Sequence, residues 1–149
     1  MSLAGWVCAA KAPAAAEEGI LAMGANGVIR CISAVTLAVR DMARAIAFYE
    51  KLGFELFYGG PGAGFCSLRA GEALVNLATT RDGYDGEWWG RVIFRVVDVD
   101  AKYRVLAAEG FEIEAPKDAP WGERFFHVRD PDGHELSFAA VLERSRGGP

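Results

Sequence analysis

Two histidines and a carboxylate lie close together near the C-terminus, and these residue types bind metals or transfer protons. The chain reads RDPDGHELSF there, with Glu135 directly after His134, and His127 comes before the turn. The DPDG sequence is typical of a tight turn, so the two histidines flank a hairpin and can approach each other. One interpretation is a surface metal site, and the other is a pair of solvated histidines at a strand end.

The strand after this turn alternates in polarity, which predicts the direction of its side chains. Glu135 and Ser137 share one side, whereas His134 is expected on the opposite side. Glu135 is the best acid–base candidate, provided that its surroundings are dry enough to raise its pKa. We find no covalent-catalysis pattern, because Ser137 has no obvious base on its side and Cys66 has no nearby activating His or basic residue.

The elements that would position these residues occur twice. VTLAVRDMARAIAFYEKLGFEL (35–56) aligns without gaps on VIFRVVDVDAKYRVLAAEGFEI (92–113), which indicates an internal duplication. Each copy predicts a strand, a helix with Asp41 or Asp98 as N-cap and Gly53 or Gly110 after its last turn, and a resumed strand.

Two further strand candidates follow each copy, so each half reads βαβββ. This order predicts an α+β fold of two such modules, and their free sheet faces can enclose a cleft for a ligand. We expect residues 1–30 to be a tail or dimer arm. Residues 31–149 form the domain, with modules at about 32–80 and 90–142.

Composition restricts the classes of partner. The chain has 149 residues, 52% of them hydrophobic, and a net charge of −4. This balance argues against nucleic-acid and anionic-membrane partners and favours a cationic or neutral ligand. No apolar run is long enough to span a membrane. The chain lacks a basic n-region and any CxxC pair, so we expect neither a signal peptide nor a thiol–metal site, and we expect a cytoplasmic protein.

The first copy, the second copy and the segment WGERFFHVRDPDGHELSF together resemble the vicinal oxygen chelate superfamily over about residues 32–142. That superfamily contains glyoxalase I, extradiol dioxygenases, fosfomycin-resistance enzymes and bleomycin-binding proteins. The resemblance implies the paired-sheet fold and a homodimer, built either with sites at the interface or by exchange of modules. It does not imply one activity, because this fold hosts several chemistries.

The resemblance also implies where a metal would be held, by one residue on the first and one on the last strand of each module. Those positions fall at Ala34, Asn76, Arg91 and Ser137. Alanine has no donor atom, arginine repels a dication, and neutral amide and hydroxyl oxygens are weak ligands. We therefore expect no metal and no cofactor.

The cleft would instead be lined by a mixed set of side chains. If Arg91 faces it, Ile93 and Arg95 do too by alternation, together with Asn76 and Ser137. The two arginines could clamp an anionic group. They could equally pair internally with Glu135 or Glu72.

Aromatic residues gather near the predicted openings of the cleft. Trp88, Trp89 and Trp121 suit stacking against a flat ligand, and Trp88 and Trp89 suit a dimer interface equally well. Trp121 is assigned to the pocket because it precedes the strand that bears Arg124.

Three functions fit this pattern. The first is a metal-free small-molecule binding protein of the bleomycin-resistance type, which sequesters an aromatic or amphipathic ligand. The second is a metal-dependent glyoxalase- or dioxygenase-like enzyme with non-standard ligands. The third is an interaction module with a vestigial cleft.

Overall fold

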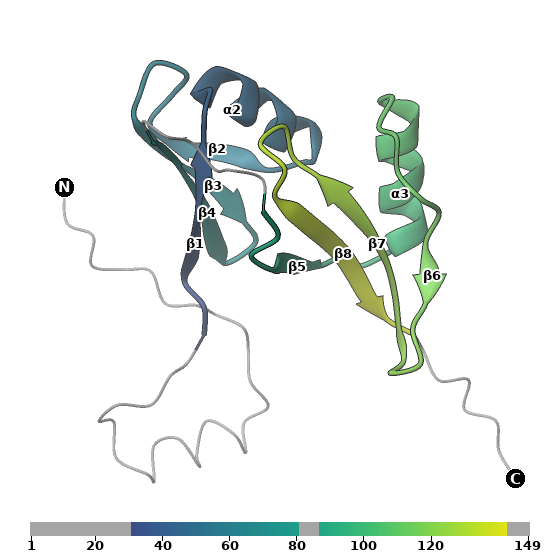
Figure 1. Cartoon of the computed structure of the whole chain (residues 1–149). Helices are drawn as coiled ribbons and strands as arrows, with labels where there is room; N and C mark the ends of the chain where they lie inside the picture. The colour runs from purple at the N-terminus through teal and green to yellow at the C-terminus, as the bar shows by residue number, and fades with distance from the viewer. Residues whose placement is uncertain (1–30, 81–86, 143–149) are drawn as a thin grey trace, which may run out of the picture.

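The computed structural model describes residues 31–80 and 87–142 as two four-stranded sheets with one helix each (Figure 1). The first module has β1, α2, β2, β3 and β4 at Ala34–Val39, Met42–Lys51, Glu55–Tyr58, Phe65–Ala70 and Ala73–Thr79. The second has β5, α3, β6, β7 and β8 at Arg91–Arg95, Val99–Ala108, Lys117–Asp118, Glu123–Arg129 and Glu135–Val141. The predicted α+β fold of two βαβββ modules is confirmed. The predicted tail or arm, residues 1–30, lies outside the described residues.

Both sheets have the same topology. Their strand orders are β1-β4-β3-β2 and β5-β8-β7-β6. The first and last strands of each module pair in parallel, and the other neighbours are antiparallel. One strand of the second module is displaced: it does not resume at Phe111 as predicted, and β6 has only two residues after Pro116. Proline lacks a backbone donor, which makes a strand before it less stable.

The helix boundaries follow from their capping residues. Asp41 accepts a hydrogen bond from the Arg44 backbone N–H at 2.9 Å, and Asp98 accepts one from Ala101 at 2.9 Å. Gly53 and Gly110 have φ of 90° and 87°, the left-handed conformation that ends a helix without steric cost. The N-caps and the glycines were all predicted from the repeat.

The two modules share one hydrophobic core. The predicted apolar stripe of α2 is buried, and Tyr49 on this stripe is fully enclosed. Phe54 of the first module contacts Phe94 of the second with ring centroids 5.0 Å apart, and Phe48 contacts Phe111 at 5.4 Å. Since the core continues across the module boundary, the relative positions of the two sheets are fixed by packing.

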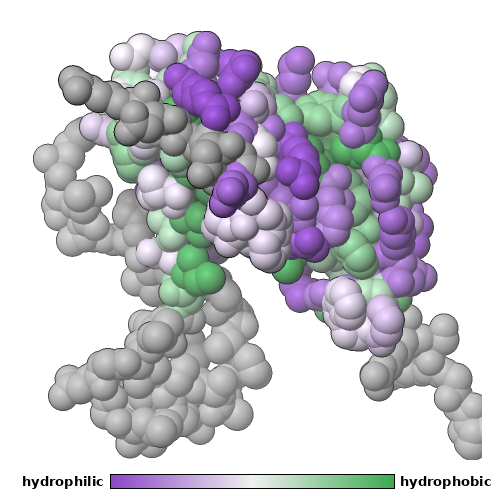
Figure 2. Space-filling model, viewed as in Figure 1, coloured by the Kyte–Doolittle hydropathy of each residue, from purple (hydrophilic) through white to green (hydrophobic). Residues whose placement is uncertain are grey.

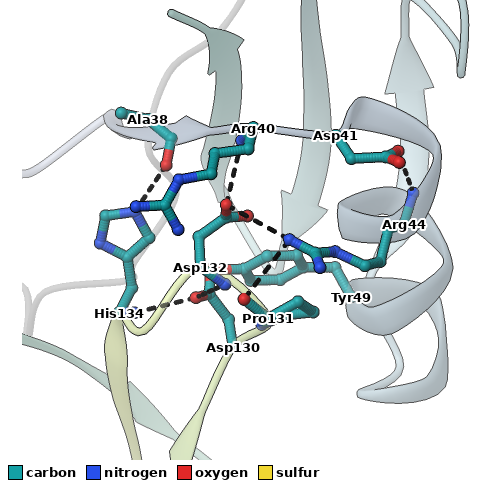
Figure 3. Close-up of polar contacts among 9 residues, drawn as sticks. All are labelled: Ala38, Arg40, Asp41, Arg44, Tyr49, Asp130, Pro131, Asp132 and His134. Atoms are coloured by element: carbon teal, nitrogen blue, oxygen red, sulfur yellow. Dashed lines mark hydrogen bonds and ion pairs between the residues drawn. The ribbon is translucent and has the colours of Figure 1, made fainter. Parts of the chain in front are cut away.

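The DPDG turn joins the modules (Figure 3). Asp130 Oδ2 accepts a hydrogen bond from the Tyr49 hydroxyl at 2.9 Å, while its Oδ1 accepts the backbone N–H groups of Asp132 and His134. Asp132 Oδ1 accepts the Arg40 backbone N–H at 3.0 Å. Burial, and then the charge of Asp130, raise the pKa of Tyr49 above its ordinary value, so this hydroxyl remains a donor.

His134 also contacts the first module, so it belongs to the contact between the DPDG turn and that module, which we call the joint. The expectation of a solvated histidine is therefore wrong for His134. Its side chain is buried, with the residue only 3% exposed. Its Nε2 lies 2.7 Å from the Ala38 carbonyl oxygen, and its Nδ1 lies 2.9 Å from Trp89 Nε1. A carbonyl only accepts and an indole N–H only donates, so His134 Nε2 donates to Ala38 and Nδ1 accepts from Trp89.

Neither described helix, each of ten residues, is long and apolar enough to cross a membrane.

Candidate functional site

The surface of each sheet that faces away from its helix is called here the free face. In the second module Arg91, Ile93 and Arg95 lie on it along β5, as predicted, while Val92 and Phe94 face the core. The register places Glu135 beside Arg91 and Ser137 beside Ile93. The predicted grouping of these side chains on one face is therefore what the structure shows.

A connected polar network occupies the centre of this free face. Arg91 forms an ion pair with Glu135 at 2.5 Å, and Glu135 is also 3.5 Å from Arg129. A second nitrogen of Arg91 lies 3.1 Å from His127 Nε2, and His127 Nδ1 lies 2.5 Å from the Ser137 hydroxyl. The predicted internal pairing of Arg91 with Glu135 is thus present.

The arginine fixes the state of His127. A guanidinium can only donate, so Nε2 accepts and Nδ1 carries the proton that is donated to Ser137. Burial lowers the pKa of His127 below its ordinary value, and the neighbouring Arg91 charge lowers it further. His127 is therefore a neutral imidazole with both nitrogens engaged.

This donor set does not fit a divalent metal. The ligand positions implied by the resemblance hold Arg91 and Ser137 here, and the one imidazole beside them has its acceptor nitrogen occupied by the guanidinium. In residues 31–80 and 87–142 no group of three His, Cys, Asp or Glu side chains is arranged to hold a metal ion. A dication would have to displace Arg91 and overcome its repulsion.

Ser137 has a histidine partner that sequence reasoning missed. The hairpin register pairs His127 with Ser137, and a turn of five residues from Asp130 to His134 could have revealed this. His127 is the donor in this pair, so it does not activate the hydroxyl as a nucleophile. Ser137 is 2% exposed, so the side chain that the free face presents at this point is His127.

The first module has a different free face. Asn76 lies there as predicted, where it accepts a hydrogen bond from Ser67 at 2.7 Å and lies 3.4 Å from the Thr36 hydroxyl. These side chains are short and uncharged. Cys66 faces the core instead, and burial raises the pKa of its thiol, which leaves it a poor nucleophile.

An aromatic row runs along β7 and the residues just before it, up to the polar network. The Trp121 indole stacks on Phe125 with centroids 6.0 Å apart and an interplanar angle of 18°, and Phe125 lies 5.0 Å from the His127 ring. Trp121 is 70% exposed and donates its N–H to Glu123. We call Trp121, Phe125 and His127 the aromatic row.

The remaining candidates are dispersed. Arg124 does not join the free face, because its guanidinium binds Asp100 of α3 at 2.8 and 2.9 Å and Asp118 at 2.6 Å. Trp88 is exposed. Trp89 is half-exposed and is held by the buried His134.

A cavity of about 700 Å³, which we call the slot, opens between the two sheets. Its walls come from the start of β1, the link between α2 and β2, the β3–β4 turn, and β5 with Trp89 before it. Lys102 of α3 and Phe138 of β8 complete them. Side chains from both faces of β5 line it, so the slot follows the free edge of that strand. Figure 2 shows exposed apolar surface near the start of β1, and Ile32, 72% exposed, lines the slot there.

Comparison with known proteins places these features in a family. Residues 32–138 match the Glyoxalase/Bleomycin resistance protein/Dioxygenase superfamily. An uncharacterized protein of Mycolicibacterium smegmatis is 34% identical over 116 residues, which are 76% of this chain and 96% of that protein.

Two solved structures are similar in fold and sequence. A bleomycin-binding protein complexed with bleomycin is 25% identical with a TM-score of 0.63, and the match covers 78% of this chain and all of that one. TnmS3, an antibiotic binding protein from Streptomyces sp. CB03234, is 26% identical with a TM-score of 0.64, over 76% of this chain and 98% of that one. With its duplicated βαβββ modules and the match over residues 32–138, the chain belongs to the glyoxalase/bleomycin resistance protein/dioxygenase superfamily.

Proposed function

We propose that this protein is a metal-free small-molecule binding protein of the bleomycin-resistance type. It takes an aromatic or amphipathic ligand into the cleft between its modules. The observation that carries the proposal is the Arg91–His127–Ser137 chain of hydrogen bonds. A permanent cation, Arg91, stands at one implied ligand position, and Ser137, linked to it through His127, stands at another, so the site recognises organic groups by contact rather than by coordination.

The aromatic row supports the proposal that the ligand is aromatic. Trp121 and Phe125 are already stacked on each other, and the outer face of an exposed indole offers a large rigid surface to a planar molecule. Asn76 and His127 supply neutral polar groups on the two free faces, and Arg91 and Arg95 supply charged donors. Relatives that bind bleomycin and another antibiotic share the fold, which supports sequestration of such compounds.

Calorimetric titration tests the proposal. The purified protein is titrated with bleomycin and with flat aromatic probes, in buffer with EDTA and in buffer with added Zn²⁺ or Mn²⁺. Equal affinity in both buffers supports the proposal. Binding that requires the metal would contradict it and would favour the metal-dependent enzyme.

A matched pair of tryptophans localises the site. Trp121→Ala removes the end of the aromatic row and should weaken binding of a flat ligand about tenfold. Trp88→Ala removes an equally exposed indole outside the row and should leave the affinity within about twofold. Equal losses in both variants would show that the row is not the binding surface.

We further propose a cytoplasmic homodimer. The thiol of Cys66 is free and buried, as expected in a reducing compartment. Val97, Val141 and Trp88 are exposed apolar residues that association would cover. Sedimentation velocity tests the dimer, and a monomer at micromolar concentration would contradict it.

A further inference from the structure

The walls of the slot carry positive charge only. Arg69, Arg91, Arg95 and Lys102 line it, and none of its described lining residues is Asp or Glu. The whole chain, by contrast, has 20 acidic and 16 basic residues. The expectation of a cationic or neutral ligand was based on the net charge of the whole chain, and the local charge of the slot has the opposite sign.

The carboxylates that pair with two of these arginines lie on the free face, outside the slot. Glu135 is shared between Arg91 and Arg129, so one carboxylate serves two guanidinium groups. Arg95 reaches Glu123 at 3.4 Å, and its side chain is 67% exposed. Exposed pairs with such geometry are weak, so Arg95 retains donors for an incoming anion.

The fourth cation lies deeper, against apolar surface. Lys102 donates a hydrogen bond to the carbonyl of Leu52 at the end of α2, and its nitrogen is 5.1 Å from the centroid of the Phe138 ring. Burial lowers the pKa of Lys102, and none of the ion pairs in the described part of the chain includes it. A negative charge in the slot would compensate this amine.

The rest of the slot suits an apolar body. Phe94 lies between Phe54 and Phe138, with ring centroids 5.0 and 5.7 Å away, and all three line the slot. Ile93, 61% exposed, and Leu74 add aliphatic surface. The volume is within the range of pockets that take drug-sized molecules.

We propose that the slot binds amphipathic organic anions, with a carboxylate or sulfonate beside Arg95 at the mouth and an aromatic or aliphatic body against Phe94. This inference rests on the proposed binding function and adds a second site to it, because the residues of the aromatic row do not line the slot. Charge complementarity and apolar burial act together, so neither a neutral amphiphile nor an inorganic anion alone binds as well.

Three planar probes of equal shape test the sign of the charge. 2-Naphthoate, 2-naphthamide and 2-naphthamidine differ in charge at one substituent, and each is titrated into the full chain by calorimetry. We expect naphthoate to bind about tenfold more tightly than the amide, and the amidine to bind most weakly. High salt should reduce the preference for naphthoate, because it screens exposed charges. Methyl NMR signals of Ile93 and Leu74 should shift on binding, whereas Val105 on α3 should not.

Variants of two arginines test whether Arg95 causes the preference for naphthoate over the amide. Arg95→Gln should weaken naphthoate about tenfold and leave the amide within about twofold, and Arg95→Lys should retain part of the preference. Arg104→Gln, an exposed arginine of α3 outside the slot, should change neither.

The outcomes separate this inference from the function on which it rests. Equal binding of the three probes, tighter binding of the amidine, or equal effects of the two Gln variants would overturn the anion site while leaving a binding protein. If no probe binds, and bleomycin and flat aromatic probes also fail, both proposals are wrong. Binding of naphthoate without shifts of Ile93 and Leu74 would likewise overturn the assignment to the slot.

Discussion

The two free faces have the same backbone and opposite chemistry. By register, Ala34, Leu74, Ser67 and Asn76 of the first module correspond to Arg91, Glu135, His127 and Ser137 of the second. The first set is an apolar pair beside a neutral hydrogen bond of 2.7 Å. The second is an ion pair beside a histidine–serine hydrogen bond of 2.5 Å.

This difference shows which positions hold the fold and which hold the site. Capping residues Asp41 and Asp98, and the glycines Gly53 and Gly110, are the same in both modules because both helices need them. The free-face side chains do not cap the helices, so they could diverge independently in the two modules. Specific recognition is therefore expected mainly from the second module.

The largest effect is expected at the hairpin turns, where the modules also differ. Asp130→Ala removes the acceptor of the Tyr49 hydroxyl and of two backbone N–H groups, all buried. We expect a loss of about 3 kcal/mol in the free energy of unfolding, measured by urea denaturation. Glu72→Ala in the exposed β3–β4 turn should cost less than about 0.5 kcal/mol. Similar losses at both turns would show that the joint is not specific to the second module.

The next effect distinguishes the two free faces in ligand binding. Phe125 and Phe65 occupy corresponding positions on β7 and β3. Phe125→Ala removes the centre of the aromatic row and should weaken a flat aromatic ligand about tenfold by calorimetry, whereas Phe65→Ala should change it less than about twofold. A larger loss of affinity in Phe65→Ala than in Phe125→Ala would show that the binding surface lies on the first module.

A smaller effect is expected in the pH dependence of stability. The pKa of His127 is lowered in the folded chain, so the unfolded chain binds more protons at slightly acidic pH. The stability contribution of His127 is complete above its unfolded pKa of about 6.5 and is lost as the pH falls through that value toward the folded pKa.

His127→Ser, which copies Ser67 of the first module, should remove this part of the pH dependence. Urea midpoints from pH 7.5 to 5 measure it. A variant whose midpoint falls with acidity as steeply as that of the parent chain would show that His127 is not the group responsible.

The smallest effect is expected at Asn76. Its side chain bonds Ser67 and is only partly buried, so Asn76→Ala should cost about 1 kcal/mol or less in thermal or urea unfolding. A loss well above that would mean that the neutral face is as strongly coupled as the charged one.

The fold could be predicted because it repeats and follows local rules. Helical spacing from Met42 to Leu52, the N-caps and the glycines fix α2 and α3, and strand alternation placed Arg91, Ile93 and Ser137 on one face. Each of these signals spans a few residues, so one sequence is sufficient to detect it.

The site was predicted less well because its partners are set by long-range register. Arg124 was expected at the cleft, and Trp121 was assigned there because it precedes the strand of Arg124, but the neighbour of Arg124 in space is Asp100 of α3. His134 is buried by contacts with Ala38, 96 residues away, and with Trp89, 45 residues away. No local pattern contains this information.

Metal analysis of the protein, purified without chelator, tests the central claim most directly. With Arg91 bonded to His127 and His127 to Ser137, we predict far less than one Zn, Mn, Fe or Ni per chain by mass spectrometry, and no heat on titration with these ions. One ion per chain that is lost in Ser137→Ala would contradict the account, because the second free face would then be a metal site.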